Sequence, residues 1–351
     1  MESQPARTRI FLPPSRNVLH EVRDDGSVVP FQPEPLPIDA EETKKGVAAS
    51  ANGWLALPCD GGRRVLVVHV SAARRETLRQ IAVPEDREAT CSVVKGGWLF
   101  VATSGHSRSG PPALHAINLV GSTADWIDIP IPEQAIRYRR EFDDLIVVGD
   151  ELVALDNVLS TKQLFRFDIS RFPQSELLSS DVFFSGSYAE ADRVVCGNGW
   201  VAAKCSTAFD MGCSDDIVLW SLPDWHKVGE IYQSGSMIRR NSGDPAGKDN
   251  VFRSPWARIE AMGSLLLFET FDGLGVLDVA AVLASWRARA GAAAAMHPDQ
   301  FTALAAQHWS VLPSLGGSIT ALPDEGLLAI GGKVGRAYTV ADLRSQSVWA
   351  R

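Results

Sequence analysis

The chain contains the stretch Gly96-Gly97-Trp98-Leu99-Phe100-Val101, in which two glycines are followed by a run of large apolar residues. A glycine or an acidic residue precedes a similar run at five other places, 52–57, 149–154, 197–202, 262–267 and 324–329. Counted from Trp54 to Trp98, Leu152, Trp200, Leu265 and Leu327, the steps are 44, 54, 48, 65 and 62 residues. The chain therefore contains an internal repeat, and its period is typical of a four-stranded unit with variable loops.

Each repeat continues with a second run in which alternate positions are apolar and a polar residue stands near the end: 66–70, 114–119, 164–169, 217–222, 274–279 and 337–340. Outer strands are expected at 126–129, 227–232, 308–312 and 347–349. Alternating runs rich in β-branched and aromatic residues, bounded by turn residues, are typical of strands. We therefore predict an all-β fold, a single β-propeller domain over residues 1–351 with four-stranded antiparallel blades.

The amino-terminal part of the chain adds a hairpin to these six repeats. Asp24-Asp25-Gly26 separates two strand-like runs, 17–22 and 27–31, and Asp-Gly favours a tight turn. The hairpin resembles the third and fourth strands of a further blade, which is completed either by 9–12 or by strands near the carboxyl end. Seven blades are therefore favoured, and six is the alternative.

A helical insertion is predicted around 280–306. The alanine-rich segment 279–290 has Asp278 as a cap and Gly291 as a stop, and a second helix is expected over 298–307, with a proline early in the helix. An insertion between two strands of a blade either covers part of the propeller or binds a partner.

A polar connector is predicted at 233–256, and it is locally basic in an acidic protein. A basic loop either meets an acidic surface or is simply a solvated run of charge. The candidate binding residues in the connector and the insertion are Arg239, Arg240, Lys248, Arg253, Trp256, Trp286, Arg287 and Arg289.

Composition places the chain among ordinary globular proteins, because 45% of its 351 residues are hydrophobic and 22% are charged. Residues 1–10 lack the apolar stretch of a secretory signal, and no run approaches the roughly 20 apolar residues of a membrane helix. We therefore expect a cytoplasmic protein that does not bind membranes. A net charge of −8 argues against non-specific binding to nucleic-acid phosphates and is compatible with a basic partner.

No catalytic residue or cofactor is predicted. The segment 243–249 lacks the spacing and the hydroxyl residue of a phosphate-binding loop, and 105–110 lacks the nucleophile elbow of a serine hydrolase. Five cysteines, with Cys196, Cys205 and Cys213 spaced unlike zinc ligands, indicate buried free thiols. A divalent cation bound in the propeller channel stays an alternative, because several loops are acidic. Its candidate ligands are Asp143, Asp144, Asp156, Asn157, Asp210, Asp215 and Asp216.

Three tryptophans, Trp54, Trp98 and Trp200, occupy the same position of the repeat. A large side chain at an equivalent place in several blades predicts packing between neighbouring sheets rather than a ligand site.

The last repeat, Leu327-Leu328-Ala329-Ile330-Gly331-Gly332 with Tyr338 and Trp349 after it, resembles a kelch-type blade, in which paired glycines end one strand and a tryptophan follows. The other repeats lack this glycine pair, and none has the Gly-His and Trp-Asp signature of WD repeats. The resemblance therefore extends to the propeller class but to no narrower family, and it implies no catalytic residues.

These observations favour a non-catalytic protein-interaction propeller, such as an immunity protein that neutralises a toxin, or an assembly protein. The alternative is a metal-dependent hydrolase or lactonase with its site at the channel mouth. Sugar binding through loop aromatics is a third hypothesis.

Overall fold

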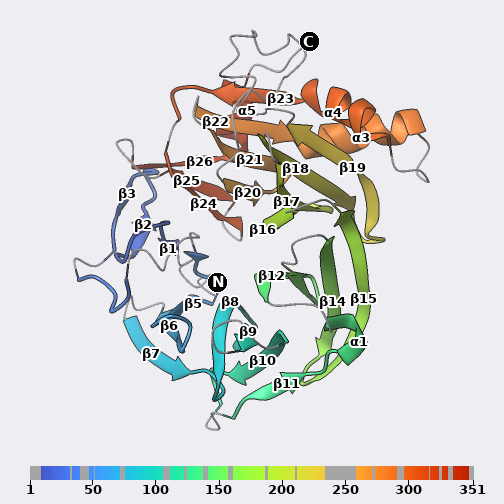
Figure 1. The fold of residues 1–351 in the computed structure, drawn as a ribbon. Coiled ribbons are helices and arrows are strands. Elements are labelled where there is room, and N and C mark those ends of the chain that lie inside the picture. The colour runs from blue at the N-terminus through green and yellow to red at the C-terminus, as the bar shows by residue number, and fades with distance from the viewer. Residues whose placement is uncertain are drawn as a thin grey trace, which may run out of the picture. The chain divides into compact units, whose positions relative to one another are not determined.

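The computed structural model describes residues 9–31, 34–39, 47–50, 52–71, 76–105, 111–121, 125–136, 141–156, 161–185, 189–209, 212–233, 258–270, 273–290, 296–315, 317–323, 326–330 and 335–347. The fold is all-β, a β-propeller of seven antiparallel sheets (Figure 1). Five sheets have four strands and two have three among these residues. The prediction of seven blades is confirmed.

Contacts divide the chain into two compact units, each of which is described by itself. The first comprises Met1–Val158, Gln163–Val182 and Gly335–Ala337. The second comprises Leu159–Lys162, Phe183–Val334 and Tyr338–Arg351. That the whole chain forms a single domain stays a prediction.

The first unit contains three of the sheets and most of a fourth, in which the ends of two strands, 161–162 and 183–185, belong to the second unit. The first sheet has the order β3-β2-β1-β4, with β1 (Ile10–Leu12), β2 (His20–Val22), β3 (Val28–Pro30) and β4 (Val47–Ala48). The second consists of β5 (Trp54–Cys59), β6 (Arg64–Val70) and β7 (Glu76–Ala82). The third consists of β8 (Arg87–Lys95), β9 (Trp98–Gly105), β10 (Ala113–Asn118) and β11 (Ile127–Ile129), and the helix α1 (Glu133–Ile136) follows it. The fourth consists of β12 (Phe142–Val148), β13 (Glu151–Asp156), β14 (Thr161–Arg171) and β15 (Gln174–Ser185).

The amino-terminal hairpin is completed by β1, one of the two expected alternatives, and by β4; among the described residues no strand near the carboxyl end joins its sheet. Strand β1 pairs with β2, with Phe11 opposite His20. The hairpin turn also pairs with a segment near the carboxyl end, through a bridge between Ser27 and Arg336 and a 2.8 Å hydrogen bond from the Ala337 N–H to the Gly26 carbonyl. Within the first unit, chain segments from both ends of the sequence are thus hydrogen-bonded together.

The second unit contains two four-stranded sheets and most of a three-stranded one, in which residues 336–337 belong to the first unit. The strands of the first are β16 (Ala189–Gly197), β17 (Trp200–Phe209), β18 (Gly212–Ser221) and β19 (His226–Gln233). Those of the second are β20 (Arg258–Met262), β21 (Leu265–Thr270), β22 (Gly273–Asp278) and β23 (Trp309–Leu312). The third has β24 (Ile319–Leu322), β25 (Leu327–Ile330) and β26 (Arg336–Thr339). The helices α3 (Val279–Ala290) and α4 (Pro298–Ala306) lie between β22 and β23 in sequence, which confirms the predicted insertion. None of the helices among the described residues is long and apolar enough to span a membrane.

Two helices were not predicted from the sequence, α1 and a helix in the last repeat. In that repeat α5 (Val340–Gln346) follows β26 directly, before the position of the outer strand expected at 347–349. Thr339 and Asp342 form a capping box, in which each side chain accepts the backbone N–H of the other. Residues 348–351 lie outside the described part of the chain, so Trp349 is not placed.

The six repeat starts are turns that lead into a strand, and their glycines explain the repetition. Gly53, Gly97, Gly149, Gly199, Gly263 and Gly326 all have a positive φ, between 59° and 80°. A side chain with a Cβ is strained in this left-handed region, whereas glycine adopts it freely. The repeated glycine therefore serves the backbone of a tight turn.

The polar residue near the end of the third strand also has a local role in several repeats. Asn118 Oδ1 accepts the backbone N–H groups of Val120 and Gly121, both at 2.9 Å. Asp168 and Asp278 accept the N–H groups of Ser170 and Ala281 in the same way. These side chains satisfy donors in the next turn or at the next helix start. The bond to Ala281 confirms Asp278 as the cap of α3.

The repeated tryptophans pack between neighbouring sheets, as predicted. Trp200 is fully buried in a cluster that includes Ile259 and Leu266 of the next sheet. The Trp98 ring lies against Phe172 of the neighbouring sheet, with ring centroids 4.8 Å apart. Trp54, partly buried, borders a cluster that spans its own sheet and the next. These side chains belong to the core.

Candidate functional site

The structure places only part of the predicted binding surface. Arg239, Arg240, Lys248, Arg253 and Trp256 lie outside the described residues, as does nearly all of the connector 233–256. Trp286, Arg287 and Arg289 lie on α3 and are described.

The insertion covers the outer edge of β19. Phe301 of α4 lies on Gly229, where an added Cβ would come within 2.5 Å of the ring. Two carbonyls of β19 receive hydrogen bonds from the insertion: Val228 from the Met296 N–H at 3.1 Å, and Glu230 from the Thr302 hydroxyl at 3.4 Å. An outer strand otherwise presents unpaired backbone groups, which invite association with other chains. The insertion thus protects β19.

Trp286 was expected to contact a partner, and the structure places it in the core instead. Its side chain is 1% exposed and stacks on His226 of β19, with ring centroids 5.5 Å apart. The apolar side of α3 must be buried to hold the helix against the sheet, and Trp286 lies on that side. Arg287 and Arg289 are exposed, and Arg289 Nη2 donates to Gln307 Oε1 at 3.4 Å.

A chain of hydrogen bonds crosses three strands of the first unit and has the residue types of a catalytic triad. Thr103 Oγ1 lies 3.0 Å from His115 Nε2, and His115 Nδ1 lies 2.7 Å from Asp128 Oδ1. Burial lowers the pKa of His115, against the opposing effect of the Asp128 carboxylate, and so favours the neutral ring. Nδ1 then donates to Asp128, and Nε2 accepts from the threonine. Thr103 is fully buried, so its hydroxyl has no access to a substrate, and the chain ties β9, β10 and β11 together.

Buried charge in the second unit forms a pair between neighbouring sheets. Arg193 Nη2 of β16 donates to Glu260 Oε1 of β20 at 2.6 Å, and the Glu260 side chain is 7% exposed. Both residues lie on the first strand of their sheet. A buried pair of this kind is costly to break by removing one partner, because the other charge is left uncompensated.

Three of the seven candidate metal ligands are enclosed within their sheets, and Asp143 is partly exposed. Asp144, Asp156 and Asp216 are buried, and Asp156 accepts the backbone N–H of Gln163. Asp210 and Asn157, and the Asp215 side chain, lie outside the described residues. Among the residues that the structure describes, no three His, Cys, Asp or Glu side chains are grouped as metal ligands would be. A metal-dependent hydrolase stays a prediction.

Four cysteines are described, and all are free thiols. Cys205 is fully buried, and Cys196 is partly buried, with burial raising its thiol pKa to about 11. A thiol with this pKa is a poor nucleophile and a poor metal ligand at neutral pH. This agrees with the expected buried thiols; the Cys213 side chain lies outside the described set.

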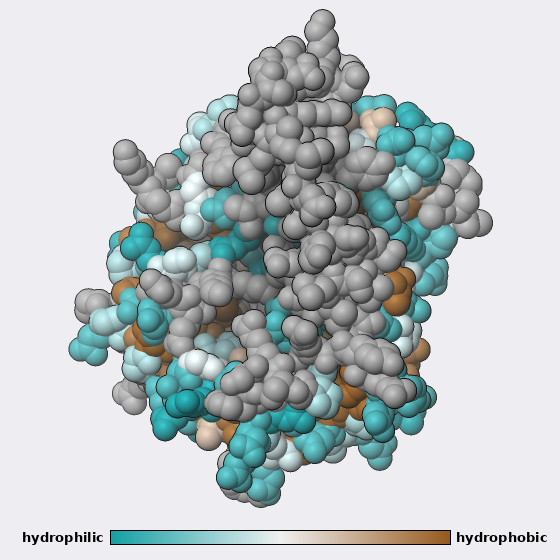
Figure 2. Space-filling model, viewed as in Figure 1, coloured by the Kyte–Doolittle hydropathy of each residue, from teal (hydrophilic) through white to brown (hydrophobic). Residues whose placement is uncertain are grey.

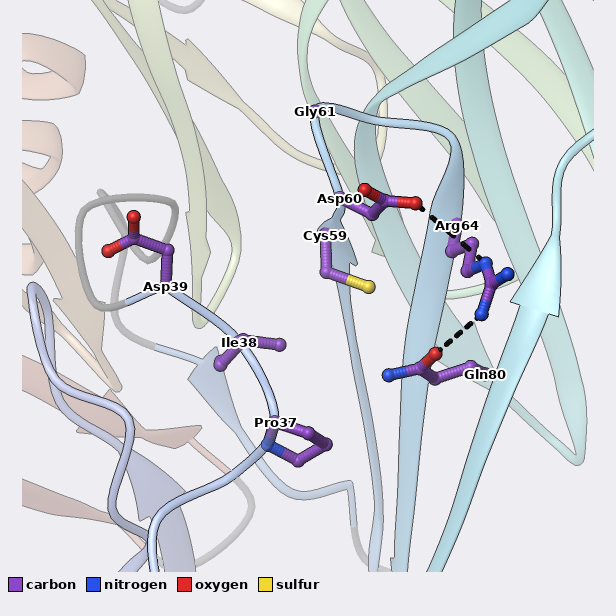
Figure 3. A pocket seen from close by; sticks show the side chains of 8 residues that line it. All are labelled: Pro37, Ile38, Asp39, Cys59, Asp60, Gly61, Arg64 and Gln80. Atoms are coloured by element: carbon purple, nitrogen blue, oxygen red, sulfur yellow. Dashed lines mark hydrogen bonds and ion pairs between the residues drawn. The ribbon is translucent and has the colours of Figure 1, made fainter.

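A hollow of about 550 Å³ lies between the segment before β4 and the sheet of β5, β6 and β7. Figure 3 shows Asp39 on one side and the Arg64–Gln80 pair on the other, with Cys59 between them. Arg64 Nη1 donates to Gln80 Oε1 at 2.9 Å, and Arg64 Nε lies 3.8 Å from Asp60 Oδ2. The guanidinium is thus already engaged by groups of its own hairpin, and the hollow is wide open to solvent.

The outer strands of the first unit expose large apolar side chains. Leu178 is 47% exposed and Val182 56% on β15, and Leu78 is 44% exposed on β7. Val120, at the turn after β10, is the fourth large apolar side chain exposed among the described residues, and all four belong to the first unit. Figure 2 shows apolar residues at the right-hand margin, where Figure 1 places β15.

The apolar residues of β15 lie on its solvent face. Strand side chains alternate between two faces, so Glu176, Leu178, Ser180 and Val182 share one of them. On the other face, Leu177 packs against the core beside α1, and Phe183 is buried against Trp220, with centroids 5.1 Å apart. We call Glu176, Leu178, Ser180 and Val182 the β15 surface. The sequence did not predict β15, because its apolar residues occur together at 177–178 and 182–184 and do not alternate with polar ones.

No protein-family model matches the chain, and no curated protein matches it by sequence. Several solved structures are similar to it at low sequence identity. One, provisionally assigned as a 6-phosphogluconolactonase from Bacteroides uniformis, is 12% identical with a TM-score of 0.47; the match covers 99% of this chain and 97% of that one. A functionally unknown protein from Desulfotomaculum acetoxidans is 8% identical with a TM-score of 0.41, over 78% and 93% of the two chains.

A third structure is the extracellular domain of a protein from B. thetaiotaomicron, provisionally assigned as a one-component system. It is 13% identical with a TM-score of 0.39, and the match covers 77% of this chain. This chain spans about a third of that domain, since the match covers 32% of it.

Proposed function

We propose that this protein is an interaction propeller that binds another protein through the β15 surface. The observation that carries the proposal is a contrast between two outer strands of the same chain. On β19 the insertion covers the edge and buries the apolar residues, whereas β15 leaves Leu178 and Val182 about half exposed on one face. Exposed apolar side chains gathered on one element typically mark a surface that a partner covers.

The internal polar networks support the same proposal. His115 is engaged by Thr103 and Asp128, and Arg193 by Glu260, so these groups hold strands and sheets together. A rigid scaffold with variable outer surfaces is what an interaction propeller needs. A toxin or an assembly subunit stays the predicted class of partner, and a cytoplasmic location stays the predicted setting.

Affinity purification of the full chain from its host cell tests the proposal. We expect a protein to co-purify in stoichiometric amount with the native chain and with Leu78→Asp, and to be lost with Leu178→Asp. Leu78 is a matched control, because it is also a leucine on an outer strand and is 44% exposed against 47% for Leu178. If no stoichiometric protein is found, or if both variants lose it equally, the β15 surface is not the binding site.

A further inference from the structure

We infer that the occupant of the β15 surface is a basic amphipathic helix of the partner protein. This inference rests on the proposed function and specifies what the partner presents. It is drawn from three features of the chain: how α4 covers β19, how Leu178 and Val182 are spaced, and which charges surround them.

The chain itself shows how an outer strand of this fold is covered. Strand β19 is the last strand of its four-stranded sheet, as β15 is of its own. The helix α4 buries Phe301, Leu304 and Ala305, which lie at positions i, i+3 and i+4 on one side of the helix. Phe301 fits over Gly229, where the strand has no side chain. On β15 the strand itself supplies exposed apolar side chains, so a helix of the partner that covers them needs an apolar stripe of its own.

The spacing on β15 matches such a stripe. Leu178 and Val182 are four residues apart on one strand face, or about 13 Å. Two turns of helix advance about 11 Å, so apolar residues at i, i+3, i+4 and i+7 reach both side chains. Strand side chains stand nearly perpendicular to the sheet, so an element lying across the face buries them. An extended segment added to the edge would lie beside them and leave the face open.

The charges around the apolar pair favour a basic partner. Glu176 lies on the same face two residues before Leu178, whereas Asp181 is exposed on the opposite face of the strand. Two basic residues lie near: Arg171 ends β14, and Lys227 Nζ donates to the Phe183 carbonyl at 2.9 Å but is also paired with Glu230. The whole chain carries a net charge of −8. A second copy of the chain would bring the same carboxylates and the same net charge, whereas lysines and arginines flanking an apolar stripe are complementary to them.

Site-specific photo-crosslinking in the full chain tests the inference. A p-benzoylphenylalanine replaces Leu178 in one variant and Leu78 in the control, and the cross-linked peptide is identified by mass spectrometry. We expect a partner adduct at position 178 alone, in a positively charged segment with apolar residues at i, i+3, i+4 and i+7. An adduct to an alternating or acidic segment, or to a second copy of this chain, overturns the helix while leaving β15 as a contact surface. No adduct, or the same adduct at both positions, contradicts the proposed function itself.

Synthetic peptides provide a second measurement that does not depend on finding the partner. The probe is an 18-residue leucine–lysine peptide with leucines at i, i+3, i+4 and i+7, and its control has the same composition in strict alternation. We expect fluorescence anisotropy to show at least tenfold weaker binding of the helical peptide to Leu178→Asp/Val182→Asp, and unchanged binding to Leu78→Asp. Equal binding of the two peptides, or equal loss in all variants, overturns the inference.

Discussion

Replacement of Phe301 by alanine should strongly destabilise the second unit. The ring is fully buried between α4 and β19, in a cluster that also includes Trp286 and Leu304. Truncating a buried phenylalanine costs about 3–5 kcal/mol, because apolar contacts are lost and a cavity remains. Domains are typically stable by about 5–15 kcal/mol, so the change is a large share of the total.

The residue beneath the ring allows a sharper test. In Gly229→Ala, the new Cβ would lie 2.5 to 2.9 Å from three atoms of the Phe301 ring, which is too close without movement. Overpacking of this kind costs about 1–3 kcal/mol. In Phe301→Ala/Gly229→Ala the ring is gone, and the methyl group enters the cavity that it leaves. We expect the double variant to be no less stable than Phe301→Ala alone. The coupling energy between the two substitutions is then at least as large as the destabilisation that Gly229→Ala causes by itself.

Urea unfolding followed by tryptophan fluorescence measures these differences, since Trp286 and Trp309 lie in the same cluster. Gln300→Ala on the exposed side of α4 is the control, and we expect it to change the free energy of unfolding by less than about 0.5 kcal/mol. A cost under about 1 kcal/mol for Phe301→Ala, or costs of the two substitutions that simply add, would contradict the packing of the ring on Gly229.

Three further predictions follow from buried groups. Burial lowers the pKa of His115 below its usual 6.5, so the unfolded chain binds a proton at a higher pH than the folded chain does. The free energy of unfolding should therefore fall as the pH drops below about 6.5. Between pH 7.5 and 5, the urea midpoint should fall less steeply in His115→Gln than in the control His297→Gln. Because the pKa of Cys196 is about 11, iodoacetamide at pH 8 should label it only in urea, and mass spectrometry showing equal labelling in the native protein would contradict this. In Gly197→Ala, the Cβ would lie 2.2 Å from Trp200 Cε2 and 2.5 Å from the Gly263 carbonyl oxygen. The urea midpoint should therefore drop by an amount equivalent to about 1–3 kcal/mol. An unchanged midpoint would show that the turn can move to accommodate the methyl group.

Much of the local structure was predictable because its causes are local. The glycine that starts each repeat is required by the positive φ of its turn, and Asp278 caps α3 through a side chain three residues from the donor. The helix α5 was missed, although Thr339 and Asp342 have the spacing of a capping box. Such signals involve neighbours in sequence, so they are readable without the fold.

The candidate site was not predictable in the same way. Trp286 and Arg287 are adjacent in sequence and were both expected to bind a partner, yet one is buried on β19 and the other faces solvent. Strand β15 was not predicted at all, because its apolar residues occur together and do not alternate with polar ones. The exposure of Leu178 depends on which elements pack over the strand, and neighbouring residues do not encode that.

The sequence by itself determined the repeating all-β architecture, the turns between strands and the helical insertion, because glycine conformation, alternation and capping act over a few residues. Only the tertiary structure decided which outer strand the insertion covers and which one keeps apolar side chains at the surface. That choice depends on contacts between segments some 70 residues apart, such as Thr302 with Glu230, and on Gly229 leaving room for Phe301. Burial arises from the packing of whole elements, so the surface available to a partner appears only when the sheets are assembled.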